Sequence, residues 1–261
     1  MPLSLAYSSV LLALLSGAVA LLAEFHTRHG RPAPTGRKTG SGSQRLIFGL
    51  LTLSGAAALA GGILALLGPE IFHDQLPFGL PWMRWQVRLD ALSGFFLATI
   101  GAGVIAVSFF GPGYVLEYRS HQRPMWLLGL CTGLFIAGME LVLVADDAFF
   151  FVIAWELMSV SSYFLVAFQH EHAENRRAAF LYLLMAVIGA IAIILAFGVL
   201  AAFAHGFGFD GFRALRLSHF WGSTAFLLAL LGFGMKAGLV PGHSWLPEAH
   251  PAAPSPVSAM M

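Results

Sequence analysis

Seven long apolar stretches constrain the fold of this chain more than any other feature. They lie at residues 3–23, 46–67, 91–111, 125–145, 148–168, 178–204 and 222–240, and another apolar stretch begins at residue 256. Each of the seven is close to the ~20 residues that an α-helix needs to cross a bilayer. The sequence therefore predicts an all-α, polytopic membrane helix bundle, with about seven transmembrane helices and the start of an eighth at residues 256–261.

The composition agrees with a membrane domain and excludes several other classes of protein. Charged residues make up only 10% of the chain, whereas soluble domains carry about 25%. The net charge of +1 provides no basic surface for nucleic acid, so the expected partner surface is the lipid bilayer. The single cysteine, Cys131, forms no intrachain disulfide and by itself builds no zinc or iron–sulfur site. We expect no redox chemistry within this chain.

The distribution of Lys and Arg predicts the orientation of the bundle. Nine of these residues follow the first, third and fifth apolar stretches, and four follow the second, fourth and sixth. Cytoplasmic connections carry the excess of positive charge, which places the N-terminus outside a cell inner (plasma) membrane. Residues 24–45 are predicted to form a flexible, basic cytoplasmic loop. Because no basic residue precedes residues 3–23, we favour a retained first helix over a cleaved signal peptide.

Lys236 lies at the end of the seventh stretch. A lysine in a membrane segment is costly, at least ~2.5 kcal/mol on insertion scales, and therefore marks a candidate functional site. Gly232, Gly234, Gly238 and Pro241 surround it and favour a broken helix whose freed backbone groups face protein or water. In this interpretation Lys236 exchanges a proton in a wet interior. In the alternative, it marks the cytoplasmic end of the helix and extends its ammonium group to the interface.

Glu156 lies near the middle of the fifth stretch. A carboxylate at that depth must be protonated, paired with a cation or in contact with water. It is either a functional proton site or a protonated acid that binds a neighbouring helix. Lys236 is its natural partner, because two such groups in a medium of low dielectric change each other's proton affinity.

Other polar residues offer weaker candidates. Glu140 lies toward the outer end of the fourth stretch, where it either transfers protons or extends outward to solvent. Asp146 and Asp147 suggest a solvated turn. His243 and His250 are seven residues apart, a poor spacing for metal ligands, and either buffers protons near Lys236 or makes helix–loop hydrogen bonds. The residues His170, Glu171, His172 and Glu174 suggest a wet cytoplasmic loop rather than a zinc site.

Two motifs carry a resemblance to a known family. They are Lys-Ala-Gly at 236–238, followed by His-Ser-Trp-Leu-Pro-Glu-Ala-His-Pro-Ala-Ala-Pro-Ser-Pro-Val-Ser-Ala at 243–259, and Trp-Glu-Leu-Met-Ser at 155–159. From about residue 127 onward the chain resembles the proton-conducting membrane subunits of complex I, Mrp antiporters and group 4 hydrogenases. The sequence at 246–258 is most similar to the hydrogenase branch, namely hydrogenase-4 component B and formate hydrogenlyase subunit 3.

The resemblance implies roles for particular residues. Glu156 would be the intramembrane glutamate of the family and Lys236 the central lysine on its broken seventh helix. His243 and His250 would continue the proton path. It also implies no cofactor in this chain, with Fe–S and Ni–Fe or flavin centres in other membrane and peripheral subunits of the complex.

Family members have about fourteen helices in two inverted units. Residues 1–124 would then hold helices 1–3 with the basic loop, and residues 125–261 an incomplete first unit, so that the chain is expected to be C-terminally truncated. Three functions stay open at this point. The first is a non-redox, proton-translocating component of an oxidoreductase complex of the hydrogenase-4 or NADH:quinone oxidoreductase type. The others are an Mrp-type cation/proton antiporter subunit and an inactive truncated fragment.

Overall fold

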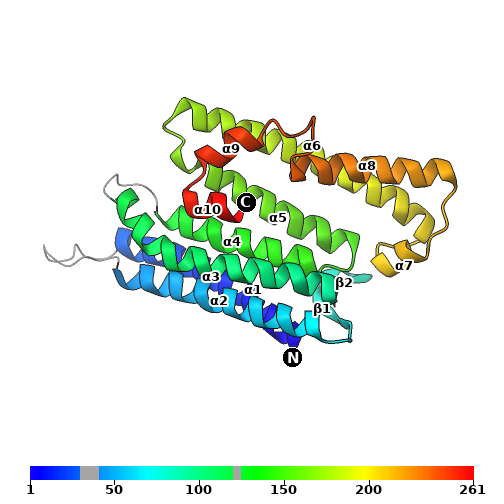
Figure 1. Cartoon of the computed structure of the whole chain (residues 1–261), viewed down its shortest axis with the longest axis horizontal. Coiled ribbons are helices and arrows are strands. Elements are labelled where there is room, and N and C mark those ends of the chain that lie inside the picture. The colour runs from blue at the N-terminus through cyan, green and yellow to red at the C-terminus, as the bar shows by residue number, and fades with distance from the viewer. Residues whose placement is uncertain (30–40, 120–124) are drawn as a thin grey trace, which may run out of the picture. The chain divides into compact units, whose positions relative to one another are not determined.

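The computed structural model describes residues 1–29, 41–119 and 125–261, and most of this chain is helical (Figure 1). In chain order the elements are α1 (Pro2–His29), α2 (Ser41–Leu67), β1 (Phe72–Leu80), β2 (Met83–Leu89), α3 (Ala91–Arg119), α4 (Met125–Val144), α5 (Ala148–Val166), the 3₁₀ turn η1 (Ala167–Gln169), α6 (Ala173–Ala204), α7 (Phe209–Ala214), α8 (His219–Ala237), α9 (Leu246–Ala252) and α10 (Ser255–Met260).

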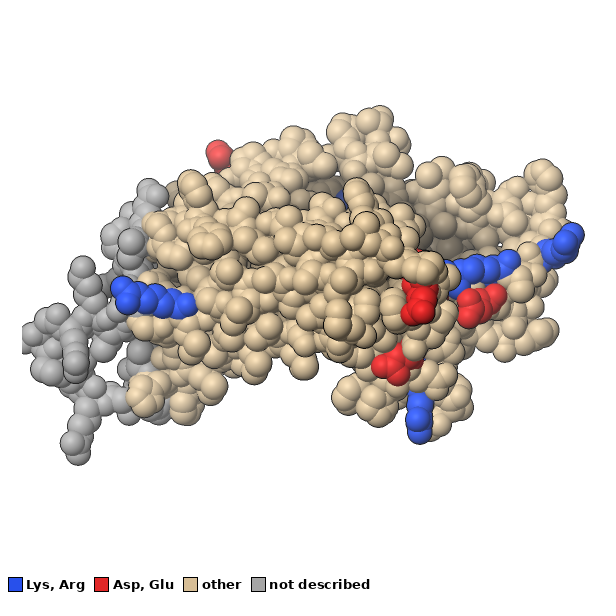
Figure 2. All heavy atoms as spheres, turned by 60° about the horizontal axis from the view of Figure 1, so that its bottom comes forward, with Lys and Arg blue, Asp and Glu red and all other residues tan. Residues whose placement is uncertain are grey.

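Seven described helices, α1 to α6 and α8, are long and apolar enough to cross a membrane. Their surfaces carry large exposed apolar side chains such as Phe109 and Phe110 on α3, as expected for helices whose solvent is lipid. On the face shown in Figure 2, Lys, Arg, Asp and Glu side chains are sparse. The predicted polytopic helix bundle is confirmed, and the chain is a multi-pass membrane protein.

Several predicted helix boundaries were too short. Helix α1 continues to His29 and α2 begins at Ser41, so both helices extend into the predicted loop at 24–45; the remaining residues, 30–40, lie outside the described part. Helix α3 continues through Pro112 to Arg119, and α6 begins at Ala173. The error has one cause: hydropathy locates the part of a helix that lies in hydrocarbon, whereas backbone hydrogen bonds continue the helix into the polar region.

Residues 69–90, which lie between two of the apolar stretches, are largely a β-hairpin formed by β1 and β2. The indole of Trp85 in β2 stacks on the ring of Phe150 in α5, with ring centroids 4.7 Å apart. The short segment between α4 and α5 adds an antiparallel bridge between Val87 and Ala145. The hairpin is thereby tied to the start of α5, an arrangement that apolar periodicity did not predict.

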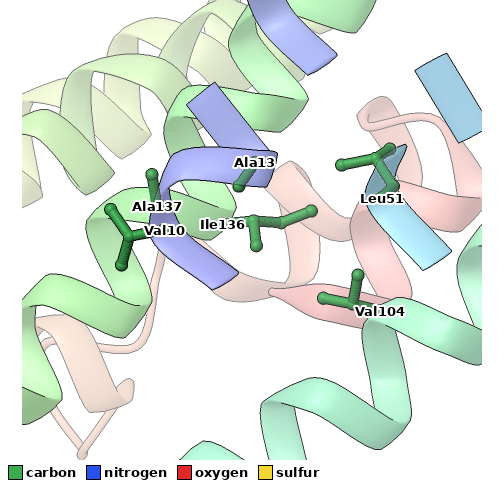
Figure 3. Packing of buried hydrophobic residues seen from close by; sticks show 6 residues of the cluster. All are labelled: Val10, Ala13, Leu51, Val104, Ile136 and Ala137. Carbon is green, nitrogen blue, oxygen red and sulfur yellow. The ribbon is translucent and has the colours of Figure 1, made fainter. Parts of the chain in front are cut away.

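The chain divides into two compact units. Unit 1 comprises residues 1–72, 89–143 and 254–261, and unit 2 comprises residues 73–88 and 144–253. In unit 1, buried apolar side chains from α1, α2, α3 and α4 meet in one cluster (Figure 3), which consists of Val10, Ala13, Leu51, Val104, Ile136 and Ala137. The division after residue 124, which was inferred from the resemblance to the family, stays a prediction.

Small residues let α2 and α3 of unit 1 approach closely. A Cβ atom on Gly55 would lie 2.7 Å from the carbonyl oxygen of Gly101, and a Cβ atom on Gly101 would lie 2.6 Å from the carbonyl oxygen of Gly55. Neither position has room for a larger residue. The small residues of the second apolar stretch thus serve close helix packing.

Candidate proton-transfer site in unit 2

Helix α8 of unit 2 ends one residue after Lys236. Gly238 follows the helix with a φ of 71°, in the left-handed region that favours glycine. The N–H of Leu239 donates to the carbonyl oxygen of Gly234 and closes the helix end. Turns occupy the next residues until α9 begins at Leu246. This confirms the predicted break, and it leaves Lys236 in the last turn of a membrane helix.

Glycines also bring α8 against α6, which runs antiparallel to it (Figure 1). A Cβ atom on Gly232 of α8 would lie 2.7 Å from the carbonyl oxygen of Gly189 of α6. Lys236 lies about one turn beyond Gly232, and Tyr182 lies about two turns before Gly189. Because the helices are antiparallel, both side chains extend to the same side of this close contact, and they meet there.

The ammonium group of Lys236 is half-buried and bound by hydroxyl groups. Its Nζ donates to the Oη of Tyr182 at 2.6 Å and to the Oγ of Ser159 at 3.3 Å. It also lies 4.9 Å from the centroid of the Tyr182 ring, a distance suited to a cation–π interaction. The Oη of Tyr182 is in turn 2.5 Å from the Oγ of Ser162. The lysine is therefore held within unit 2, which argues against the alternative that it extends to the interface.

Glu156 of α5 lies near Lys236 but does not contact it directly. The Lys236 charge acts electrostatically on the Glu156 carboxyl group, yet no direct ion pair joins them among the residues that the structure describes. The Oε1 atom of Glu156 is buried without a hydrogen-bond partner. The two residues lie near each other without an ion pair, and two of the three donor positions of the lysine are taken by hydroxyl groups.

The two histidines predicted to continue the path lie in different environments. Trp245 is buried; its ring packs edge-on against the Tyr182 ring at 5.2 Å, and its Nε1 donates to the carbonyl oxygen of Met235. The ring of His250 lies 6.3 Å from Trp245 in a nearly parallel orientation. His243 is exposed. His250 is therefore separated from Tyr182 by one aromatic ring, and no contact given by the structure links His243 to Lys236.

Glu140 lies in unit 1 and is fully buried, so the expectation that it extends to solvent is wrong. The Ser9 Oγ lies 2.6 Å from its Oε1 and 2.8 Å from the carbonyl oxygen of Ser54, and the Ser54 Oγ donates to the carbonyl oxygen of Ser9. The Ser9 hydroxyl has one proton for two acceptors. All three hydrogen bonds form together only if Glu140 is protonated and donates to Ser9. The proton count favours a neutral carboxylic acid.

The turn between α4 and α5 is also buried rather than solvated. Asp147 caps α5: its carboxylate accepts the N–H of Phe150 at 2.7 Å and the N–H of Gln86 at 2.8 Å. Burial raises the pKa of Asp147 above its ordinary value, although the same backbone donors act in the opposite direction. Neighbouring Asp146 accepts from the guanidinium of Arg213 at 3.1 Å. The solvated-turn prediction failed because the hairpin and residues 207–209 cover this turn.

Arg213 and Asp146 form an ion pair at this end of unit 2. The Asp146 side chain is 4% exposed and that of Arg213 is 47% exposed. Arg213 also donates to Asp210, one turn away in α7, and the imidazole of His73 approaches Asp146 at 3.8 Å. Burial would lower the pKa of Arg213, but the two carboxylates outweigh it and raise that pKa. This cation thus keeps its charge.

The hydroxyl groups around Lys236 were missed at the sequence level. Ser159 follows Glu156 by three residues and Ser162 follows Ser159 by three, so each successive pair shares a face of the helix. That spacing in an apolar segment was a usable signal. Tyr182 had none, because a single tyrosine in α6 meets α8 only through the glycine contact.

Comparison with known proteins supports a particular family. Residues 145–261, which include the Glu156 and Lys236 region, match the family described as NADH:quinone oxidoreductase/Mrp antiporter, TM. The resemblance expected from the two motifs is thus shown for this segment. Hydrogenase-4 component B of Escherichia coli (strain K12) is 37% identical over 221 residues, which are 81% of this chain and 32% of that protein. An uncharacterised protein of Mycobacterium tuberculosis (strain H37Rv) is 40% identical over 208 residues, which are 79% of this chain and 31% of the relative.

A solved structure shares the fold of nearly the whole chain. A chain of the membrane-bound sulfane sulfur reductase, an archaeal respiratory membrane complex, superposes with a TM-score of 0.77 at 18% identity. The match covers 97% of this chain and 49% of that chain. At this identity the likeness concerns the fold. The chain spans about a third of the length of the two curated relatives named above.

Proposed function

We propose that this chain belongs to a proton-translocating membrane subunit of a hydrogenase-4-like or NADH:quinone oxidoreductase-like complex. The proposal rests above all on Lys236, an ammonium group held by the hydroxyls of Tyr182 and Ser159 where α8 ends, with Glu156 within electrostatic reach. Such a lysine can give up and regain a proton, and each change alters the proton affinity of the carboxylate beside it.

The partners and location follow from the same proposal. The chain would lie in the inner (plasma) membrane with its N-terminus outside. Iron–sulfur and nickel–iron or flavin centres would belong to neighbouring subunits, and this chain would carry no cofactor. Electron transfer in those subunits would drive proton movement between Glu156 and Lys236. His250 extends the proposed path beyond Trp245; His243 stays a predicted member without a contact to it.

The decisive experiment replaces Lys236 in the native gene, so that the variant assembles in its own complex. Lys236→Ala removes the charge, and Lys236→Arg keeps the charge but gives up no proton at accessible pH. We expect both variants to lose redox-driven acidification of inverted membrane vesicles while native gels show an assembled complex. Full acidification in Lys236→Arg would overturn the proposal, because a fixed charge would then be sufficient.

Two further outcomes would each favour another function and overturn this one. Vesicle pH changes that require sodium and occur without an electron donor would favour an antiporter of the Mrp type. Proton flux that is unchanged in both Lys236→Ala and Glu156→Gln would indicate that this part of the protein does not transport protons.

A further inference from the structure

Tyr182 makes the shorter of the two hydrogen bonds that the structure gives to the Lys236 ammonium group, and nothing in the sequence pattern assigned it a role. It is 2% exposed, and its ring is fixed between Trp245 and the lysine. Its hydroxyl group lies between two polar neighbours, Lys236 Nζ at 2.6 Å and Ser162 Oγ at 2.5 Å. A hydroxyl group in this position both accepts and donates a hydrogen bond.

With Lys236 charged, the direction of each hydrogen bond in the chain is determined. An ammonium group donates and never accepts, so the Tyr182 oxygen accepts from Lys236. Tyr182 then donates to Ser162, and Ser162 donates to the carbonyl oxygen of Met158 at 2.7 Å. Each hydroxyl group in this series of hydrogen bonds has an acceptor, and the series ends on the backbone of α5.

With Lys236 neutral, the same nitrogen and oxygen atoms remain hydrogen-bonded without changing position. The amine then has a lone pair, and the Tyr182 proton turns from Ser162 to Nζ. Ser162 keeps its bond to the Met158 carbonyl oxygen. Only one O–H bond rotates, and the phenolic proton stays on Tyr182 throughout. The second hydroxyl near the lysine, on Ser159, lies farther away at 3.3 Å.

We propose that Tyr182 is a positioning residue that binds Lys236 in both of its charge states and so sets the pH range in which the lysine exchanges protons. The inference rests on the proposed function. Within the described part of the chain, the titratable groups placed near this lysine are Glu156 of α5 and Tyr182 of α6, and His250 of α9 lies behind Trp245. Glu156 supplies charge at a distance, whereas Tyr182 supplies the direct contact.

The test is the pH profile of proton translocation by the assembled complex carrying Tyr182→Phe. Phenylalanine keeps the ring against Trp245 and the cation–π contact, and it removes only the hydroxyl group. The charged lysine loses a stronger hydrogen bond than the neutral amine does. We therefore expect the alkaline limb of the profile to move to lower pH by about one unit.

Two companion variants complete the experiment. Ser162→Ala should shift the alkaline limb in the same direction but by less. It removes the acceptor of the Tyr182 proton and so weakens the Lys236–Tyr182 hydrogen bond only indirectly. Tyr163→Phe, which removes a hydroxyl group from the neighbouring residue of α5, should leave the profile in place. A Tyr182→Phe profile with its limb at the wild-type pH would overturn the inference, whether or not the overall rate falls.

The failures of the two proposals are distinguishable. If Lys236→Ala still translocates protons, the proposed function fails. If Lys236→Ala is inactive and Tyr182→Phe keeps the wild-type profile, only the role of Tyr182 fails. If Tyr182→Phe does not assemble, Ser162→Ala decides, and an unshifted profile in that variant overturns the inference.

Discussion

Glu140 in unit 1 and Glu156 in unit 2 are both glutamates in transmembrane helices, yet their surroundings differ. Glu140 is 1% exposed, and its carboxyl group meets the Ser9 hydroxyl in a cluster whose proton count favours a neutral acid. Glu156 is half-buried, with the charge of Lys236 within electrostatic reach. Each has one carboxyl oxygen that is buried without a hydrogen-bond partner among the described residues.

The difference lies in the neighbours rather than in the glutamates. Around Glu140 the neighbours are hydroxyl and carbonyl groups that hold one proton in place. Asp146 is a third case, because its partner Arg213 stays protonated. In the proposed function Lys236, unlike Arg213, gives up its proton during transport. Burial of an acid thus does not by itself distinguish the two glutamates; the chemistry of the partner does.

The largest expected effect comes from making each glutamate permanently neutral. Glu156→Gln should reduce redox-driven proton translocation at least tenfold, because the proton acceptor beside Lys236 is gone. Glu140→Gln should leave translocation within about twofold of wild type, since an amide can donate to Ser9 as the neutral acid does. Vesicle acidification normalised to assembled complex measures both.

The two substitutions control for each other, because both replace a glutamate in a transmembrane helix by glutamine, an amide of similar size. Equal losses in the two variants would remove the distinction between the two regions. Loss in Glu140→Gln alone would reverse it and make unit 1 the site of proton exchange.

A smaller effect should follow from removing the partner of Glu140. Ser9→Ala leaves a buried carboxylic acid without its acceptor, which should lower the free energy of unfolding by about 1–3 kcal/mol. Thermal unfolding of the purified complex in detergent measures the change. Ser8→Ala is the matched control, because the exposed Ser8 hydroxyl donates to the carbonyl oxygen of Ser4 one turn earlier in α1. Similar melting temperatures for both variants would show that the cluster is not stabilising.

The sequence predicted the bundle well because a bilayer imposes a length and a composition on each helix. It did not predict the hairpin, whose strands lie between two apolar segments and are held by tertiary contacts such as Trp85 with Phe150. It also placed Asp146 and Asp147 in solvent. Two adjacent acids between helices look like a surface turn, and only the covering backbone of β2 and residues 207–209 makes them buried.

The candidate site was predictable only in part. Glu156 and Lys236 stand out because ionisable residues in apolar segments are rare. The order of their contacts was not predictable, because it depends on the Gly189–Gly232 approach that places Tyr182 against the lysine. The same reasoning from rarity made Glu140 a candidate for proton transfer. Its actual environment was not predictable, because the hydroxyl groups that enclose it come from α1 and α2, far away in sequence.

The smallest expected effect comes from removing Arg213, the permanently charged partner of Asp146. Arg213→Ala leaves Asp146 buried without its guanidinium, and unfolding should become easier by about 1–2 kcal/mol. This is less than the ~3–5 kcal/mol for breaking a fully buried pair, because the Arg213 side chain is 47% exposed and solvent screens it. Arg216→Ala, an exposed arginine three residues away, is the matched control and should unfold like wild type. Proton translocation at permissive temperature should be unchanged in both variants. A translocation loss confined to Arg213→Ala, with normal stability, would place Asp146 on the proton path and would remove the distinction between fixed and titrating partners.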